Sequence, residues 1–146
     1  MDILSNFSQC LLSLMIERNI KAPTLAKILR TDRSNITRYL SGKRLPLYNG
    51  FISIIEYFNI SADVILGLKE YTEHNTFLPV KPFNERLKQV MAETCTTQYG
   101  IEKHTNISSS SIYNWLYAQR LPTVDSLIAL SQHMGISIDY LLGRVN

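Results

Sequence analysis

The chain of 146 residues contains two copies of one sequence pattern. The segment Arg44-Leu45-Pro46 recurs 76 residues later as Arg120-Leu121-Pro122, and the same offset joins many other positions without a gap. Among these pairs are Phe7 with Phe83, Leu11 with Leu87, Ile36 with Ile112, Leu40 with Leu116, Asp63 with Asp139 and Leu66 with Leu142. A repeat of this length with matching apolar positions predicts two copies of one structural unit.

The two copies are separated by a polar stretch from Tyr71 to Pro82 that contains two prolines, a composition typical of a linker. We therefore predict a first domain at residues 1–70, a linker at 71–78 and a second domain at 79–146. Three apolar residues in this region, Phe77, Leu78 and Val80, are expected to pack against a domain, so that the linker need not be flexible.

Hydrophobic residues make up 45% of the chain and charged residues 18%, which is enough apolar material for a buried core. The longest apolar runs, such as residues 51–55, are much shorter than the roughly 20 residues that span a bilayer. The N-terminus also lacks a basic segment followed by an apolar stretch. The expectation is a soluble cytoplasmic protein without a membrane partner.

Apolar residues at helical spacing run through both copies, and no strand pattern of similar strength competes with them. A first helix carries Phe7 and Leu11, and a fourth carries Phe51 and Phe58. Serines at 61 and 137 are placed to cap a short fifth helix, which glycines at 67 and 143 end. Each copy is thus predicted to be a five-helix, all-α bundle.

The second and third helices are defined best in the second copy. Thr97 can cap a helix over residues 98–105, and Ser108 can cap the next, over 109–117. Asn106 is expected in the turn between them, because Asn tolerates a left-handed backbone. In the first copy Asp32 is the expected cap of a helix over 33–40, and Pro23 suits the first turn of the preceding helix. Arg30 would strain a left-handed backbone at the turn.

Positive charge is concentrated in the first copy. The net charge is +3, and residues 1–72 hold nine Lys or Arg against six Asp or Glu, whereas residues 73–146 hold six of each. One stretch of the first copy has Asp32 as its only opposing charge; it holds Lys21, Lys27, Arg30, Arg33, Arg38, Lys43 and Arg44. Such a cluster is the usual electrostatic footprint of phosphate binding, although a solvated surface is the alternative.

One set of motifs occurs in the same order in both copies. The first copy has Leu25-Ala26, Ile36, Tyr39 and Gly42-Lys43-Arg44-Leu45-Pro46. The second copy has Thr97-Gln98, Ile107-Ser108, Ile112, Trp115, Arg120-Leu121-Pro122 and the ending at residues 136–143. With these motifs both copies resemble the Cro/cI-type, or XRE-like, helix-turn-helix family. The resemblance implies two tandem lambda-repressor-like DNA-binding bundles, and a transcriptional regulator of bacterial or phage type.

Three positions depart from the family pattern. Glu102 stands where the family prefers Ala, Arg30 replaces the usual turn Gly, and Ala22 replaces the usual Gln at the start of helix two. These departures leave open whether both copies bind DNA, or whether one copy serves dimerisation or binds a protein partner.

The resemblance places the third helix of each copy in the major groove of double-stranded DNA. There Arg can form two hydrogen bonds with guanine and Asn two with adenine. In the first copy the candidate contacts are Arg33, Ser34, Asn35, Thr37 and Arg38, with Lys43 and Arg44 for phosphates. In the second copy they are Ser109, Ser110, Tyr113 and Asn114, with Gln98, Gln119 and Arg120 for the backbone. Tyr39 and Trp115 share helical spacing with Ile36 and Ile112, which favours packing in the core over base stacking.

Signals for catalysis are weak, so an enzyme is not expected. The three histidines, His74, His104 and His133, are scattered, and no phosphate-binding glycine loop, metal site or cofactor site is indicated. Cys10 and Cys95 lack metal-ligand spacing and do not occupy equivalent positions, so they are expected to be free thiols. The competing hypotheses are a DNA-binding regulator, acting as one chain or as a homodimer, and an antitoxin-like or co-regulator subunit that binds a protein partner.

Overall fold

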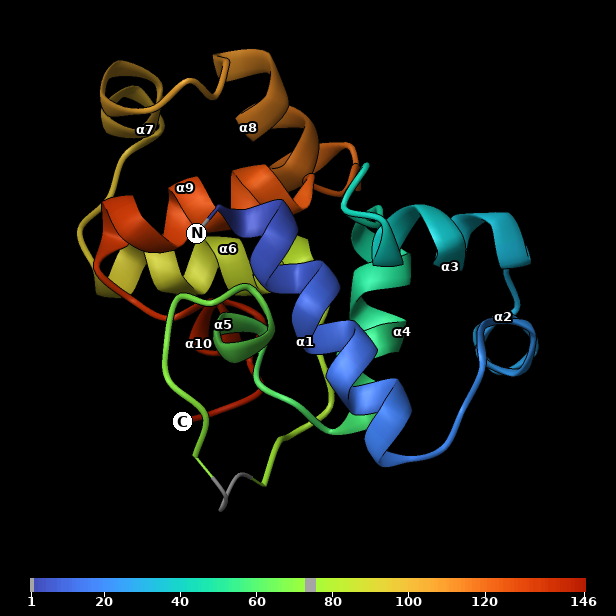
Figure 1. The fold of residues 1–146 in the computed structure, drawn as a ribbon. Coiled ribbons are helices and arrows are strands. Elements are labelled where there is room, and N and C mark those ends of the chain that lie inside the picture. The colour runs from blue at the N-terminus through green and yellow to red at the C-terminus, as the bar shows by residue number, and fades with distance from the viewer. Residues whose placement is uncertain (1, 73–75) are drawn as a thin grey trace. The chain divides into compact units, whose positions relative to one another are not determined.

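The computed structural model describes residues 2–72 and 76–146. Within these residues the chain forms helices and no strand, so the predicted all-α class is confirmed (Figure 1). The chain divides into two compact units, residues 1–75 and 76–146, here called unit 1 and unit 2. The division falls within the predicted linker, of which residues 73–75 lie outside the described part of the chain. No helix over the described ranges is long and apolar enough to cross a membrane.

Each unit contains five helices in the described residues. Unit 1 has α1 (Ile3–Glu17), α2 (Ala22–Leu29), α3 (Arg33–Leu40), α4 (Tyr48–Phe58) and α5 (Ala62–Ile65). Unit 2 has α6 (Phe83–Glu93), α7 (Gln98–His104), α8 (Ser109–Tyr117), α9 (Val124–Met134) and α10 (Ile138–Leu141). The bounds of α4 and α9, and those of α5 and α10, differ by the sequence offset of 76 at both ends. The sequence repeat is therefore also a repeat of secondary structure.

The cores of the two units use equivalent apolar residues. Fully buried pairs at the same offset include Leu11 with Leu87, Leu25 with Ile101, Ile36 with Ile112, Phe51 with Leu127 and Ile65 with Leu141. Tyr39 and Trp115 are also buried, at 6% and 5% exposure, which confirms the prediction that they pack in the core. Burial of such side chains is the main favourable contribution to folding.

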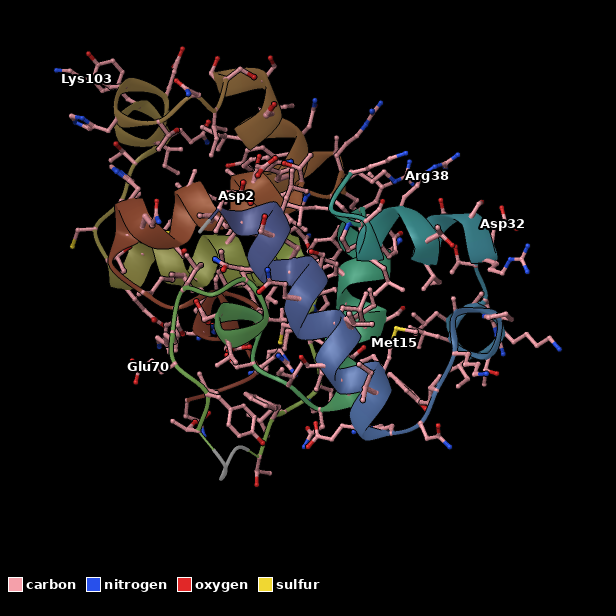
Figure 2. All side chains as sticks on the ribbon, viewed as in Figure 1. Asp2, Met15, Asp32, Arg38, Glu70 and Lys103 are labelled. Carbon is pink, nitrogen blue, oxygen red and sulfur yellow. The ribbon has the colours of Figure 1, made fainter. Side chains whose placement is uncertain are left out.

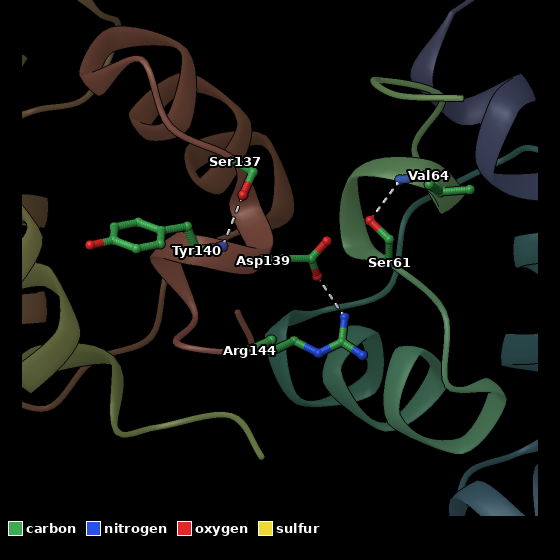
Figure 3. Close-up of polar contacts among 6 residues, drawn as sticks. All are labelled: Ser61, Val64, Ser137, Asp139, Tyr140 and Arg144. Atoms are coloured by element: carbon green, nitrogen blue, oxygen red, sulfur yellow. Dashed lines mark hydrogen bonds and ion pairs between the residues drawn. The ribbon is translucent and has the colours of Figure 1, made fainter. Parts of the chain in front are cut away.

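Side-chain caps begin several helices at the predicted residues. The hydroxyl oxygen of Thr97 accepts a hydrogen bond from the backbone N–H of Gly100 at 2.9 Å, and that of Ser108 accepts one from Ser111. Ser61 and Ser137 cap α5 and α10 in the same way (Figure 3). These caps satisfy backbone donors that have no partner within the helix.

Two local predictions near the turns are correct in position but wrong in detail. Asp32 is the N-cap of α3, but its side chain makes no capping hydrogen bond. Asn106 does not take the left-handed conformation; α7 ends at His104, and the extended Thr105 accepts a hydrogen bond from the backbone N–H of Ile107 through its hydroxyl. That hydroxyl closes the turn in place of a left-handed residue. In unit 1, by contrast, Arg30 does adopt the left-handed conformation, with φ of 56°.

Two buried arginines hold the C-terminal end of unit 2. Arg86 of α6 donates hydrogen bonds to the backbone carbonyls of Tyr140 and Leu141, which lie at the end of the four-residue helix α10. Arg144 forms an ion pair with Asp139 at 2.7 Å (Figure 3). The guanidinium of Arg144 also lies 4.1 Å from the centre of the Phe77 ring. Phe77, expected to pack against a domain, therefore contacts unit 2.

Candidate nucleic-acid interface

In unit 1 the face of α3 that does not enter the core carries most of the predicted contact residues. The helix packs against α2 and buries Ile36 and Tyr39. Its other side chains include Asn35, which is half-buried, and four exposed residues: Arg33, Ser34, Thr37 and Arg38. Figure 2 labels Arg38 on this helix and Asp32 immediately before its first residue. The structure thus leaves this polar face of α3 open to a ligand.

The chain turns sharply after α3, and this turn brings Lys43 and Arg44 next to the helix. Gly42 has φ of 72°, a left-handed conformation that glycine adopts without the strain of a side chain. The backbone N–H of Gly42 donates to the carbonyl of Tyr39, and that of Lys43 donates to the carbonyl of Arg38. This pair of bonds is the Schellman arrangement that ends many helices. Both Lys43 and Arg44 are exposed.

Asn35 connects the helix to this turn. Its Oδ1 accepts hydrogen bonds from Nη2 of Arg44 at 2.9 Å and from Nη1 of Arg38 at 3.4 Å. Its Nδ2 donates to the hydroxyl of Thr31 at 2.9 Å, and the Arg44 guanidinium lies 6.0 Å from the centre of the Tyr39 ring. Two exposed guanidinium groups are therefore gathered at one place on the surface of unit 1.

Four basic residues of this surface form no ion pair with a carboxylate in the part of the chain that the structure describes, residues 2–72 and 76–146: Arg33, Arg38, Lys43 and Arg44. Positive charge that is exposed and unpaired attracts anions and raises their rate of encounter, most strongly at low salt. The arrangement is chemically suited to bind an anionic polymer.

In unit 2 the equivalent helix, α8, has no charged residue and exposes two tyrosines. Helix α8 packs against α7 and buries Ile112, Trp115 and Leu116. The predicted residues Ser109, Ser110, Tyr113, Gln119 and Arg120 are exposed, and Gln98 and Asn114 are half-buried. The sequence prediction missed Tyr117, which is as exposed as Tyr113, at 57%, and whose ring lies 5.0 Å from the Tyr113 ring. The spacing of four residues on one helix was the signal that pointed to this pair.

The predicted residues of unit 2 also lack the contacts that gather those of unit 1. At the position equivalent to Asn35 stands Ser111, whose hydroxyl accepts a hydrogen bond from Ser108 rather than from an arginine. The loop after α8 differs as well, because its left-handed residue is Gln119, with φ of 53°. Helices α3 and α8 are thus equivalent in the repeat but expose different kinds of side chain.

Two of the three histidines, predicted to be scattered, lie together in unit 2. The rings of His104, from the end of α7, and His133, near the end of α9, stack with centres 5.7 Å apart. His74 lies outside the described residues. Across the described ranges no group of three or more His, Cys, Asp or Glu residues could hold a metal ion. Both cysteines are free thiols, as predicted.

Comparison with known proteins gives one family match. Residues 95–141 match the family model described as Helix-turn-helix, a range that begins just before α7 and ends with α10. No curated protein and no solved structure matches the chain. Unit 2 is therefore similar to helix-turn-helix domains over the range that holds α7 to α10.

Proposed function

We propose that the protein is a sequence-specific regulator of transcription that binds double-stranded DNA through both units. The observation that carries this proposal is the helix-turn-helix match in unit 2, combined with the repeat of the same helices in unit 1, where the exposed face is cationic. Helices α3 and α8 would enter the major groove, which is wide enough to admit an α-helix.

Unit 1 would supply most of the charge of the interface. Arg33 at the start of α3 would contact base edges, together with Ser34 and Thr37. Lys43, from the turn after the helix, would contact phosphates, and Arg38 and Arg44 would bind a phosphate or a guanine. Each phosphate contact releases counterions from the DNA, so the affinity of unit 1 would fall steeply with salt.

Unit 2 would contact DNA mainly with uncharged side chains. Ser109, Ser110, Tyr113 and Asn114 would contact base edges, whereas Gln98, Gln119 and the cationic Arg120 would contact the backbone. A surface with so little charge binds weakly by itself. Covalent linkage to unit 1 raises its effective concentration at the DNA, so that the chain, or a homodimer of it, can occupy adjacent half-sites.

Selection of bound sites from a random duplex pool tests this function. The full chain should enrich one sequence and bind it at least about a thousandfold more tightly than a scrambled duplex of equal length. The affinity should fall linearly with the logarithm of salt concentration. Failure to enrich any sequence, with only weak and uniform binding, would contradict the proposal.

A second candidate function is supported by the aromatic pair of unit 2. Tyrosine is enriched at protein interfaces, where it supplies a large contact area. Tyr113 and Tyr117, both more than half exposed on α8, would suit an antitoxin-like or co-regulator subunit whose protein partner covers this helix. Tight binding of a protein partner that is lost on Tyr113→Ala, without any affinity for duplex DNA, would favour this function over the first.

Neither candidate function requires a chemical step, so we propose that the protein is not an enzyme and needs no cofactor. Both place the protein in the cytoplasm, with the DNA or the regulatory partner that it binds.

A further inference from the structure

The Asn35 side chain uses both ends of its amide group within the protein. Its oxygen accepts from Arg44 and Arg38, and its nitrogen donates to the hydroxyl of Thr31. An asparagine that recognises adenine needs its oxygen and nitrogen together, because it forms one hydrogen bond with each. The observed contacts therefore assign Asn35 to a different task from base reading.

The two guanidinium groups that share Asn35 are held close to each other without a neutralising acid. Arg38 reaches the oxygen from the same helix, and Arg44 reaches it from the turn that follows. Contact with the Tyr39 ring, at 6.0 Å, further restricts Arg44. Because the two guanidinium groups are both positively charged and share only a neutral oxygen, they favour a further hydrogen-bond acceptor that both can contact. DNA offers such acceptors in its phosphate groups and in the O6 and N7 atoms of guanine.

We infer that Asn35 is a positioning residue, which holds Arg38 and Arg44 ready for one acceptor group of the DNA. The inference rests on the proposed function, and it adds that the arginine pair is ordered before DNA arrives. An ordered side chain loses less conformational freedom on binding, so pre-ordering increases affinity without adding a contact to the ligand. Unit 2 lacks this arrangement, because Ser111 replaces Asn35 and Asn114 replaces Arg38.

The test is a set of affinity measurements on the full chain with the selected duplex. Asn35→Ala should weaken binding by between about three- and tenfold, the range expected for the net contribution of one ordinary hydrogen bond. The slope of affinity against salt should stay unchanged, since the arginines can still reach DNA after losing their anchor. Ser111→Ala, the equivalent change in unit 2, is the matched control and should leave affinity within about twofold.

A double-mutant comparison separates positioning from direct reading. In an Arg38→Ala/Arg44→Ala background, Asn35→Ala should have almost no further effect, because there is nothing left to position. If Asn35 itself read a base, its loss would persist in that background, which would overturn the inference. If the shared acceptor is a guanine, the arginine variants should lose discrimination at one base pair; if it is a phosphate, they should weaken binding to all duplexes equally and lower the salt slope.

A measurement on the free protein distinguishes failure of this inference from failure of the proposed function. In ¹⁵N relaxation experiments the Nε–H group of Arg44 should be more mobile in Asn35→Ala than in wild type or Ser111→Ala. Unchanged mobility of Arg44 would overturn the inference alone, even if the wild-type chain binds DNA. Absence of any duplex binding by the wild-type chain would overturn the proposed function, and with it the role of the arginine pair.

Discussion

The rings of Phe83 and Trp115 meet edge to face, with centres 6.1 Å apart and planes at 80°. In unit 1 the equivalent rings of Phe7 and Tyr39 meet at 6.2 Å and the same angle. Each pair joins the first helix of its unit to the helix that carries the candidate contacts. Edge-to-face packing is a favoured arrangement of aromatic rings and adds to the benefit of burial.

Trp115→Ala should therefore destabilise the protein by about 3 to 5 kcal/mol, whereas Trp115→Tyr should cost much less, because a tyrosine fills this position in unit 1. Denaturant unfolding followed by far-ultraviolet circular dichroism measures the change. Tyr113→Ala, an exposed position on the same helix, is the control and should stay within about 0.5 kcal/mol of wild type. Equal losses at the two positions would contradict the shared packing of the units.

Burial raises the pKa of Tyr48 from its ordinary value of 10.0 to about 12, and the nearby Glu56 acts in the same direction. The folded state thus favours the neutral phenol. This contribution to stability is fully present below pH 10 and is lost as the pH rises toward 12. Between pH 10 and 12, the free energy of unfolding of Tyr48→Phe should therefore fall by roughly 2 kcal/mol less than that of the wild type.

Local sequence signals predicted much of this structure because they act over a few residues. A Ser or Thr just before a predicted helix can cap it, because its hydroxyl can accept from the backbone N–H three residues later. This local rule predicted the caps at Thr97, Ser108 and Ser137 correctly. The same reasoning erred at Asn106, where the hydroxyl of Thr105 closes the turn instead. Residue preference at a turn is a weak guide when a neighbour offers a second solution.

Sequence patterns did not predict the contacts between residues that lie far apart in the chain. Arg86 and Arg144 were not recognised as buried, because their partners lie on other segments that only the fold brings close. The stacking of His104 on His133 joins two helices in the same way. At the candidate interface the sequence identified the exposed residues of α3, but not the hydrogen bond from Arg44 to Asn35, which depends on the path of the turn after the helix.

The charge difference between the units predicts an order of mutational effects on DNA binding. Arg33→Ala and Arg38→Ala should each weaken binding more than Ser109→Ala or Ser110→Ala. A bidentate arginine contact to guanine contributes about 1 to 3 kcal/mol of discrimination, and a lost positive charge adds a salt-dependent penalty. Titration of each variant against the selected duplex measures the losses. Equal or reversed losses would identify unit 2 as the principal reader.

Footprinting of the full chain on the selected duplex tests most directly whether both units read DNA. The account predicts protection of two adjacent half-sites about 34 to 36 Å apart, one turn of the double helix. In a Tyr113→Ala/Asn114→Ala variant the half-site bound by unit 2 should lose protection, while the half-site bound by unit 1 remains protected at higher protein concentration. Identical footprints and equal affinities for the wild type and this variant would contradict the account, because α8 would then make no contact with DNA.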